Sequence, residues 1–466
     1  QPASVHALAR AINDALGNTG TTVMYTAPIV ASPLDGAASL AELTRDMAAG
    51  SVEVLLIIGS NPVFTAPADL DFKTALDKVK TRVHLGLYYD ETAEQCHWHI
   101  PEAHYLESWG DVRAFDGTVS LIQPLIAPLY DGRSAIEVLA SANGTGGQTT
   151  MDLVKGYWTK AFGGQTKTAW TLHDREGRAF ANVDLFWRHA LHDGFVSSTS
   201  WYAGGAPAAS AAPAAAPAAA RTTNTGMEIV FRPDPYILDG RNANNGWLQE
   251  LPRPLSKVTW DNVAYVSART AERLGVPISR VGNQDQPVLE IKYQGRSARL
   301  PVWVLPGTAD DVVVVVLGGG RLKTGRVGHD VGHNVFGLRG SNALWFDGGA
   351  EVTKTNETYA VYTTQNHFVM EGRNPVRIVE LEDFRKNPKA VEEMGPERPS
   401  YEESLYPERK YPTHKWGMAI DLNACTGCSA CIVACVAENN IAVVGKEQVA
   451  RTREMHWLRV DTYFEG

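Results

Sequence analysis

Four of the five cysteines in the chain are crowded into one segment, CTGCSACIVAC, at Cys425, Cys428, Cys431 and Cys435. Their spacing is C-x2-C-x2-C-x3-C. Thiolates two residues apart on a loop can reach three irons of one cubane, whereas the fourth cysteine, on the following helix, serves the other cluster in two-cluster ferredoxins. The segment is therefore predicted to bind [4Fe–4S] clusters. Cys425, Cys428 and Cys431 are expected on one cluster and Cys435 on a second.

Two other interpretations of these cysteines are zinc and disulfides. A structural zinc site usually takes two separated pairs of ligands, and five cysteines are too few for a disulfide scaffold. The segment departs from the bacterial ferredoxin pattern at Val436, where that pattern has proline. Lys415 and the backbone from Thr426 to Ala430 are candidates to tune the reduction potential, because hydrogen bonds to the sulfurs influence it.

The cysteines do not complete two clusters by themselves. Three thiolates leave one cubane a ligand short, and Cys435 offers one ligand to the next cluster. Cys96 is too distant in the sequence to complete the set. We therefore expect the missing ligands beyond Gly466 or in another chain.

Other residues that could bind a metal have simpler interpretations. Cys96 is expected to be a buried small apolar residue. His97 and His99 share one face of an expected strand and are expected to be structural, since no third ligand accompanies them. His329 and His333 have an i, i+4 spacing, but the glycines of GRVGHDVGHNVFG favour a loop that approaches another backbone or a cofactor.

One loop region has an unusual composition. Residues 239–262 are rich in Asn, Gly and Trp, so they either offer amides to a polar ligand or form a turn between domains. No catalytic residue can be assigned from spacing, and it stays open whether the chain has an active site of its own.

The charge and hydropathy of the chain argue against binding to nucleic acid and against a transmembrane helix. The net charge is −9, the pI is near 5.8 and no long basic run occurs, which argues against nucleic acid as a partner. The longest apolar runs, 52–58 and 312–317, are far shorter than the ~20 residues of a transmembrane helix. The opening QPASVHALAR also lacks the apolar region of a signal peptide.

The first part of the chain, residues 1–203, is predicted to be an α/β part. Apolar periodicity predicts helices over 5–16 and 40–47, strands over 21–26, 52–58 and 82–89, and further helices within 150–195. This order favours an open parallel sheet covered by helices. Ligands of such sheets lie beyond the carboxyl ends of the strands, which here are the loops after Ile58 and Tyr89.

The second half of the chain changes to a period of two. An Ala/Pro-rich linker, 204–226, precedes a predicted β-barrel over 227–350 with a hairpin around Gly295, a strand at 312–317 and a helix at 267–275. Residues 351–413 are polar and interrupted by proline, and are expected to be a connector. Residues 414–466 are expected to begin a ferredoxin-like [4Fe–4S] domain. The predicted fold class is therefore α/β plus a β-barrel.

Longer stretches of sequence resemble known families. LIIGSNPVF, YYDETAEQCHWHIPEAHYLESWGDVRAFDG and the residues after them resemble the later α/β portion of molybdopterin oxidoreductases, and 227–350 resembles their pterin-dinucleotide-binding barrel. HKWGMAIDLNACTGCSACIVACVAENN is similar to the opening of the four-cluster ferredoxin subunits that accompany those enzymes. Their fusion, together with DGRNANNGWLQELP and GRVGHDVGHNVFGLRG, resembles the large iron–sulfur subunit of the alternative complex III family.

That resemblance implies a function in electron transfer from quinol. The family's subunit carries three [4Fe–4S] clusters and one [3Fe–4S] cluster on the periplasmic side of the bacterial inner membrane. It docks on a quinol-oxidising membrane subunit and on haem c subunits, and its molybdopterin-like part lacks the metal cofactor. A rival hypothesis is an active molybdopterin oxidoreductase of the polysulfide or tetrathionate reductase type, fused to its iron–sulfur subunit. A third is a structural protein whose cysteines hold zinc.

Overall fold

The computed structural model describes residues 3–26, 29–30, 35–168, 170–200, 226–278, 284–373, 376–395, 400–406 and 409–464. The chain forms two compact units, Gln1–Asn224 and Thr225–Gly466. The predicted linker, 204–226, lies outside the described residues apart from Gly226. Within the described ranges, no helix combines the length and the apolar character needed to cross a membrane.

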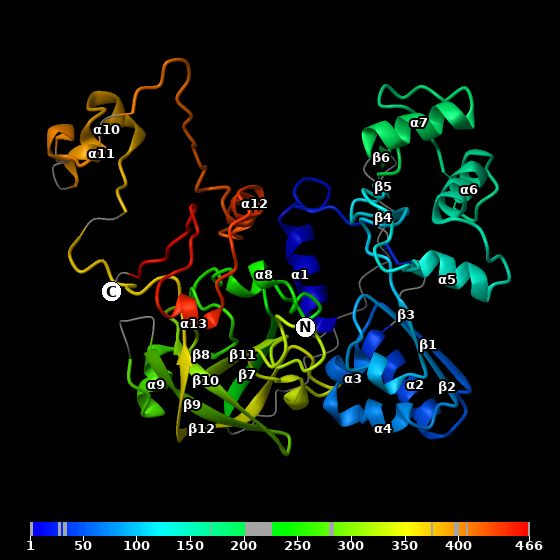
Figure 1. The fold of residues 1–466 in the computed structure, drawn as a ribbon, viewed down its shortest axis with the longest axis horizontal. Coiled ribbons are helices and arrows are strands. Elements are labelled where there is room, and N and C mark those ends of the chain that lie inside the picture. Colours follow the sequence, from blue (N-terminus) through cyan, green and yellow to red (C-terminus); the bar gives the residue numbers. More distant parts are fainter. Residues whose placement is uncertain are drawn as a thin grey trace. The chain divides into compact units, whose positions relative to one another are not determined.

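The first unit alternates helices and strands, as predicted (Figure 1). Its helices are α1 (Ala3–Ala15), α2 (Gly36–Ala48), α3 (Pro62–Thr65), α4 (Phe72–Leu76), α5 (Ala135–Ala142), α6 (Thr150–Phe162) and α7 (Val183–Asp193). Its strands are β1 (Val54–Ile58), β2 (Thr81–Gly86), β3 (Trp98–Pro101), β4 (Gly110–Arg113), β5 (Val119–Ile122) and β6 (Phe195–Val196). Two 3-10 turns, η1 (Ala68–Leu70) and η2 (Ala93–Gln95), lie between them.

A parallel sheet of order β1-β2-β3 confirms the predicted architecture. Met47 of α2 and Leu76 of α4 pack with Ile57 of β1 in one buried cluster, so these helices cover the sheet. The continuous apolar run 52–58 is typical of a strand buried on both faces, but β1 is an edge strand and Val54 is 65% exposed. The strand predicted over 21–26 is wrong, because Val23 forms only an isolated bridge with Thr19.

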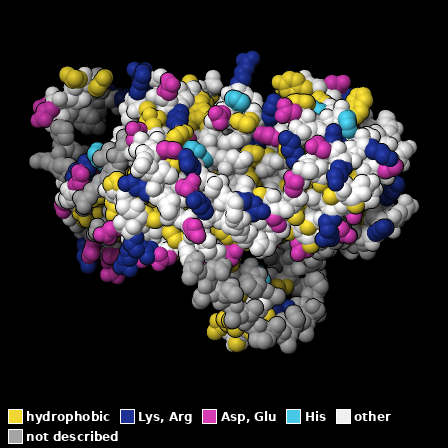
Figure 2. All heavy atoms as spheres, turned by 90° about the horizontal axis from the view of Figure 1, so that it is seen from below, with side chains coloured by type: hydrophobic (Ala, Val, Ile, Leu, Met, Phe, Trp, Pro, Cys, Tyr) yellow, Lys and Arg dark blue, Asp and Glu magenta, His cyan; other side chains and the backbone are white. Residues whose placement is uncertain are grey.

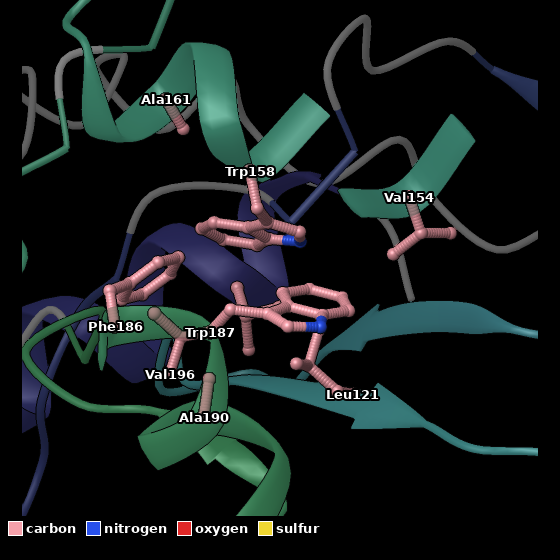
Figure 3. Close-up of a cluster of buried hydrophobic side chains, with 9 residues drawn as sticks. Leu121, Val154, Trp158, Ala161, Phe186, Trp187, Ala190 and Val196 are labelled. Carbon is pink, nitrogen blue, oxygen red and sulfur yellow. The ribbon is translucent and has the colours of Figure 1, made fainter. Parts of the chain in front are cut away.

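A second core belongs to the antiparallel sheet β4-β5-β6 and the helices α6 and α7, and Figure 3 shows its side chains. Phe186, Trp187 and Ala190 of α7 pack there against Trp158 of α6, which confirms the apolar helix face predicted within 150–195. Trp158 also donates from Nε1 to Asp111 Oδ2 of β4 at 2.9 Å. This hydrogen bond satisfies the indole N–H inside an otherwise apolar core.

The second unit is built on a closed six-stranded barrel of order β10-β8-β11-β7-β12-β9 (Figure 1). Its strands are β7 (Met227–Pro233), β8 (Ala264–Val266), β9 (Gln284–Tyr293), β10 (Arg296–Val304), β11 (Val312–Leu317) and β12 (Phe346–Val361). Gln294 and Gly295 join β9 to β10 with φ of 47° and 74°, as in a two-residue hairpin of the type I′ kind. Helices α8 (Gly246–Glu250) and α9 (Ala268–Arg273) lie in its connections. The predicted β-barrel, hairpin and short helix are thus confirmed.

The barrel extends further than predicted. The boundary placed at residue 350 falls inside β12, which continues to Val361 and pairs with β9 over Glu351–Val361. Residues 351–361 therefore belong to the barrel and not to the connector. They are polar because most of their side chains face solvent, so their composition does not mark them as a strand.

Beyond the barrel the chain has short helices: α10 (Leu381–Lys386), α11 (Ala390–Glu393), the 3-10 turn η5 (Tyr401–Glu403), α12 (Ala430–Glu438) and α13 (Lys446–Val449). On the face shown in Figure 2, acidic and basic side chains are interspersed and form no large basic patch. This distribution agrees with the acidic net charge of the chain.

Candidate metal centre

The four cysteines of the motif lie on one loop and the helix that follows it. Cys425 and Cys428 precede α12, whereas Cys431 and Cys435 are on its first and second turns. The first three are exposed and Cys435 is half-buried. The sequence led us to expect three thiols on the loop and one on the helix, whereas the structure places two before α12 and two on it.

Two left-handed residues bend the loop. Gly427 has a φ of 68° and Ser429, the residue before α12, has a φ of 63°. A serine in this region is strained, and such a residue persists only where its surroundings hold it. Ser429 is only 4% exposed although its neighbours Cys428 and Ala430 are exposed. The loop is thus anchored at Ser429.

Hydrogen-bond donors reach two of the sulfurs. The backbone N–H of Ala430 and the hydroxyl of Thr426 lower the pKa of the Cys428 thiol below its usual value, because both stabilise the thiolate. The side chain of Asn439 donates to Cys435 Sγ at 3.5 Å and to the Cys435 carbonyl at 2.9 Å. Thr426 and Ala430 lie in the region that the sequence indicated for tuning, whereas Asn439 lies beyond it.

The thiols do not converge on a common point in the structure. Among the described residues, no group of three or more His, Cys, Asp or Glu side chains is arranged to hold a metal ion. The donor set nevertheless fits an iron–sulfur group, because three accessible thiols lie on the bent loop and the first turn of α12, and N–H and O–H groups stabilise the Cys428 thiolate. The assignment of these four ligands stays a prediction.

The helix α12 is seated on the region between β7 and β8, residues 234–262, which we call the platform. Ile432 and Val436 of α12 form a buried cluster with Tyr236 and Leu251 of the platform. The two α12 residues follow Cys431 and Cys435 directly, so the packed face of α12 adjoins the face that carries the thiols. The Asn-, Gly- and Trp-rich stretch therefore serves as a docking surface for the cysteine segment.

A buried carboxylate fixes the chain after α12. Glu250 of α8 accepts hydrogen bonds from the backbone N–H groups of Val444 at 3.1 Å and Gly445 at 2.7 Å, and from Trp260 Nε1 at 3.3 Å. Trp247 on the same helix donates from Nε1 to the Ile441 carbonyl at 2.9 Å. A buried carboxylate needs such donors, because burying it unpaired is costly.

A further network joins α13 to the barrel. Lys446 Nζ lies 2.7 Å from Asp261 Oδ2 and donates to the Tyr359 hydroxyl at 2.8 Å. Tyr359 donates in turn to Asp261 Oδ1 at 2.9 Å. Burial alone would lower the pKa of Lys446, but Asp261 and Tyr359 outweigh it and raise that pKa. Lys446 therefore stays charged in this partly buried position.

The last described residues are tied to the chain that follows β12. Gln365 donates from Nε2 to the Thr462 carbonyl at 2.7 Å and accepts from the Thr462 N–H at 2.8 Å. Phe464 donates from its backbone N–H to the Phe368 carbonyl at 2.9 Å. The chain after α12 is thus held by residues that belong to the barrel or adjoin it.

The glycine-rich loop 325–337 confirms the expected close approach to another backbone. A Cβ at Gly328 would lie 2.4 Å from the Ala243 carbonyl oxygen of the platform. Among the described residues, His329 and His333 belong to no group of three or more side chains that could hold a metal ion. The His333 backbone is bonded to the Asn262 side chain at 2.7 and 2.9 Å, and the buried His333 ring lies against Tyr359. The loop is therefore a support for the platform.

The carboxyl edge of the parallel sheet, where the sequence led us to look for a ligand, carries a polar cluster. Asn61, after β1, donates to Glu91 Oε2 at 2.7 Å and accepts from Thr92 Oγ1 at 2.7 Å. The loops after Ile58 and Tyr89 are thus joined by side-chain hydrogen bonds. Whether this edge binds a ligand stays a prediction.

Two histidines lie beside this edge. His84 of β2 and His99 of β3 stack with their Nδ1 atoms 3.0 Å apart, and His84 Nε2 is 3.2 Å from the Ser60 carbonyl. Burial lowers the pKa of His99, as does the neighbouring His84. Sequence reasoning paired His99 with His97, but His97 instead accepts from the Arg82 backbone N–H at 3.0 Å. The signal that was missed is the parallel register, which sets residue 84 opposite 99.

Cys96 lies apart from the motif. Its side chain packs against the cluster that covers the parallel sheet, and burial raises the pKa of its thiol. It is only half-buried, so the expectation of a buried small residue holds in part.

No family model matches the sequence. One stretch of 46 residues is 54% identical to the menaquinone reductase iron-sulfur cluster-binding subunit of Nitratidesulfovibrio vulgaris, covering 10% of this chain and 18% of the relative. Another of 105 residues is 35% identical to the molybdopterin-binding-like subunit of menaquinone reductase from the same organism, covering 22% of this chain and 15% of the relative. The chain therefore spans less than a fifth of the length of either curated relative.

A solved structure also shows some likeness. Acetylene hydratase from Pelobacter acetylenicus aligns with 68% of this chain and 46% of its own, with a TM-score of 0.43 and 15% identity. At this level the likeness supports no inference about fold or function.

Proposed function

We propose that this chain is an iron–sulfur electron-transfer subunit of a quinone-linked oxidoreductase complex. The observation that carries the proposal is the C-x2-C-x2-C-x3-C motif on a bent loop and a helix that packs on the platform. The comparison with known proteins also supports the proposal, because two stretches of this chain resemble two different subunits of menaquinone reductase from one organism.

In this proposal Cys425, Cys428 and Cys431 hold one [4Fe–4S] cluster and Cys435 holds a second. The clusters supply one-electron transfer when bound. The chain itself supplies thiolates, hydrogen bonds to Cys428 and Cys435, and a rigid platform under α12. Hydrogen bonds to the sulfurs and burial are the means by which a protein adjusts the reduction potential.

The more specific proposal is the large iron–sulfur subunit of an alternative complex III. The combination of an α/β unit, a barrel and a cysteine motif in one chain supports it. In this proposal the α/β unit and the barrel form a scaffold without molybdopterin, and the complete subunit carries a [3Fe–4S] cluster besides its [4Fe–4S] clusters. Its partners are a quinol-oxidising membrane subunit and haem c subunits, on the periplasmic side of the bacterial inner membrane.

The experiment is iron and labile-sulfide analysis of the intact protein, with absorption near 400 nm, on cysteine variants. We expect C425A, C428A and C431A to lose the same cluster, and C435A to perturb a different one, when followed by electron paramagnetic resonance. C96A is the matched control and should keep the wild-type iron content. Zinc in place of iron, or an iron loss in C96A equal to that in C428A, would contradict the assignment.

The rival is an active molybdopterin oxidoreductase, and the polar cluster at the carboxyl edge of β1-β2-β3 favours it. Molybdenum and pterin analysis of the intact complex separates the two proposals. Stoichiometric molybdenum would support the rival, whereas iron without molybdenum and pterin would support the scaffold.

A further inference from the structure

We propose that His84 and His99 form an acid–base site for a single proton at the carboxyl edge of the sheet β1-β2-β3, with Asp90 as its counter-charge. The two imidazole rings bind this proton as one unit, through the hydrogen bond between them. The site contains no residue of the cysteine segment, so the inference goes beyond the proposed function and is tested independently of it.

The two rings meet through a nearly linear contact. Residue 84 of β2 is paired with residue 99 of β3, and Gly86 leaves room for the His84 ring, because a Cβ at Gly86 would lie 2.4 Å from His84 Cε1. The two Nδ1 atoms are 3.0 Å apart and the ring centres 5.2 Å apart. This is close to the largest separation of the centres that such a contact allows, so the contact runs almost along the line between them. It is therefore a hydrogen bond in which one Nδ1 donates and the other accepts.

The second nitrogen of His84 determines which ring donates. His84 Nε2 is 3.2 Å from the Ser60 carbonyl oxygen, and a carbonyl only accepts, so Nε2 carries a hydrogen. A neutral imidazole carries one hydrogen, so His84 Nδ1 carries none and accepts from His99 Nδ1. The nitrogen of His99 without a hydrogen is therefore Nε2. The neutral pair thus accepts a proton at His99 Nε2.

This arrangement accepts one proton and opposes a second. When a proton binds to His99 Nε2, the Nδ1–H of His99 still donates to His84, so the hydrogen bond between the rings is kept. The next proton has only His84 Nδ1 to bind. Its N–H would point at the N–H of His99 and break the hydrogen bond. The two rings therefore titrate as a coupled pair.

Asp90 lies where it balances the added charge. Its Oδ1 is 3.9 Å from His84 Nε2, and both side chains are buried. The same oxygen is fixed by the backbone N–H groups of Thr92 and Ala93, at 3.0 and 2.9 Å. Burial lowers the pKa of His99 and His84 acts in the same direction, whereas Asp90 raises that pKa. The carboxylate thus favours the protonated pair.

The other titratable groups at this edge have different surroundings. Glu91, next to Asp90, accepts from Asn61, and Tyr89 sets its ring edge-on to His99 with the centres 5.6 Å apart. Glu102, after β3, lies beside Gly59, and burial raises the pKa of its carboxyl. Among the described residues, Asp90 is thus the carboxylate in contact with the pair.

The test is nitrogen-15 NMR of the intact protein labelled at histidine, because the chemical shift of a ring nitrogen shows whether it carries a hydrogen. His84→Gln and His99→Gln assign the signals. Near neutral pH we expect His84 to lack the hydrogen at Nδ1 and His99 to lack it at Nε2. On acidification one proton should enter the pair, with a pKa below the ordinary 6.5 of histidine.

Asp90→Asn removes the counter-charge and keeps an oxygen for the N–H groups of Thr92 and Ala93. It should weaken proton binding by the pair about tenfold, the lower end of the effect of an adjacent opposite charge. Glu91→Gln is the matched control and should leave the proton affinity near that of the wild type.

Three results would overturn the inference: an Nε2 without hydrogen in His84, two protons taken up together at one midpoint, or equal effects of Asp90→Asn and Glu91→Gln. None of these results depends on iron, so each leaves the proposed function standing. Absence of iron from the intact protein would instead overturn the proposed function and leave this site.

Discussion

Lys257 of the platform is a buried cation. It is 2% exposed, and its ammonium donates to the Pro254 carbonyl. Burial lowers its pKa to about 8, while Asp461 acts to raise that pKa and Arg459 to lower it. The ordinary value is 10.5, so the unfolded chain binds the proton more tightly than the folded one.

This gives a pH dependence with a definite sign. Below pH 8, Lys257 is protonated in both the folded and the unfolded protein, and the cost of burying its charge is fully present. Between pH 8 and 10.5 the folded protein loses this proton first, so the free energy of unfolding should rise with pH. We expect Lys257→Met to stabilise the protein at pH 7 by roughly 1–3 kcal/mol and to flatten that rise. Denaturant unfolding of both proteins at several pH values measures it. A parallel rise in the two proteins would show that Lys257 is not its source.

At the scale of elements, Glu250 of α8 joins the platform to the chain after α12. Its carboxylate accepts from the N–H groups of Val444 and Gly445. We expect Glu250→Ala to lower stability by about 2–3 kcal/mol, because hydrogen bonds to a charged group are lost and the half-buried N–H groups of Val444 and Gly445 lose their acceptor. Hydrogen exchange of the two amides should become correspondingly faster.

The control for this prediction is Glu447→Gln on α13, which removes an exposed carboxylate close in sequence. It should leave both exchange rates unchanged. If the amides of Val444 and Gly445 exchange at wild-type rates in Glu250→Ala, these hydrogen bonds do not hold the segment.

The elements differ in how well the sequence predicted them. The hairpin at Gly295 and the helix that begins after Ser267 were predictable, because a turn or a cap marks each within a few residues. The platform was ambiguous, because its role depends on contacts such as Trp247 with Ile441, which lie far apart in the sequence. Likewise, only the parallel register brings His84 to His99.

For the whole molecule, each unit has hydrophobic clusters of its own, so we expect two unfolding transitions in calorimetry. Trp158 is 1% exposed in a core of the first unit, and Trp158→Ala should destabilise that unit by about 3–5 kcal/mol while the other transition stays in place. Trp416→Ala is the control, since this side chain is 95% exposed. Equal shifts of both transitions would contradict independent units.

The fold class was predictable because the period of the hydrophobic pattern changes along the chain from that of helices and parallel strands to that of hairpins. The end of the barrel was not, since solvent-facing residues of β12 have the composition of a loop. The spacing of the cysteines predicts their chemistry. The surface on which α12 packs could not be predicted, because it is formed by residues without a metal-binding signature, such as Tyr236 and Leu251 of the platform.

The order of these parts along the chain has a consequence for synthesis. Translation proceeds from the N-terminus, so the platform and all six barrel strands, which end at Val361, emerge from the ribosome before Cys425 does. The surface that receives α12 can therefore fold while the thiols are still to be made. Iron would then bind to a cysteine loop whose docking surface has already folded. Assembly of the metal centre need neither wait for the folding of the barrel nor direct it.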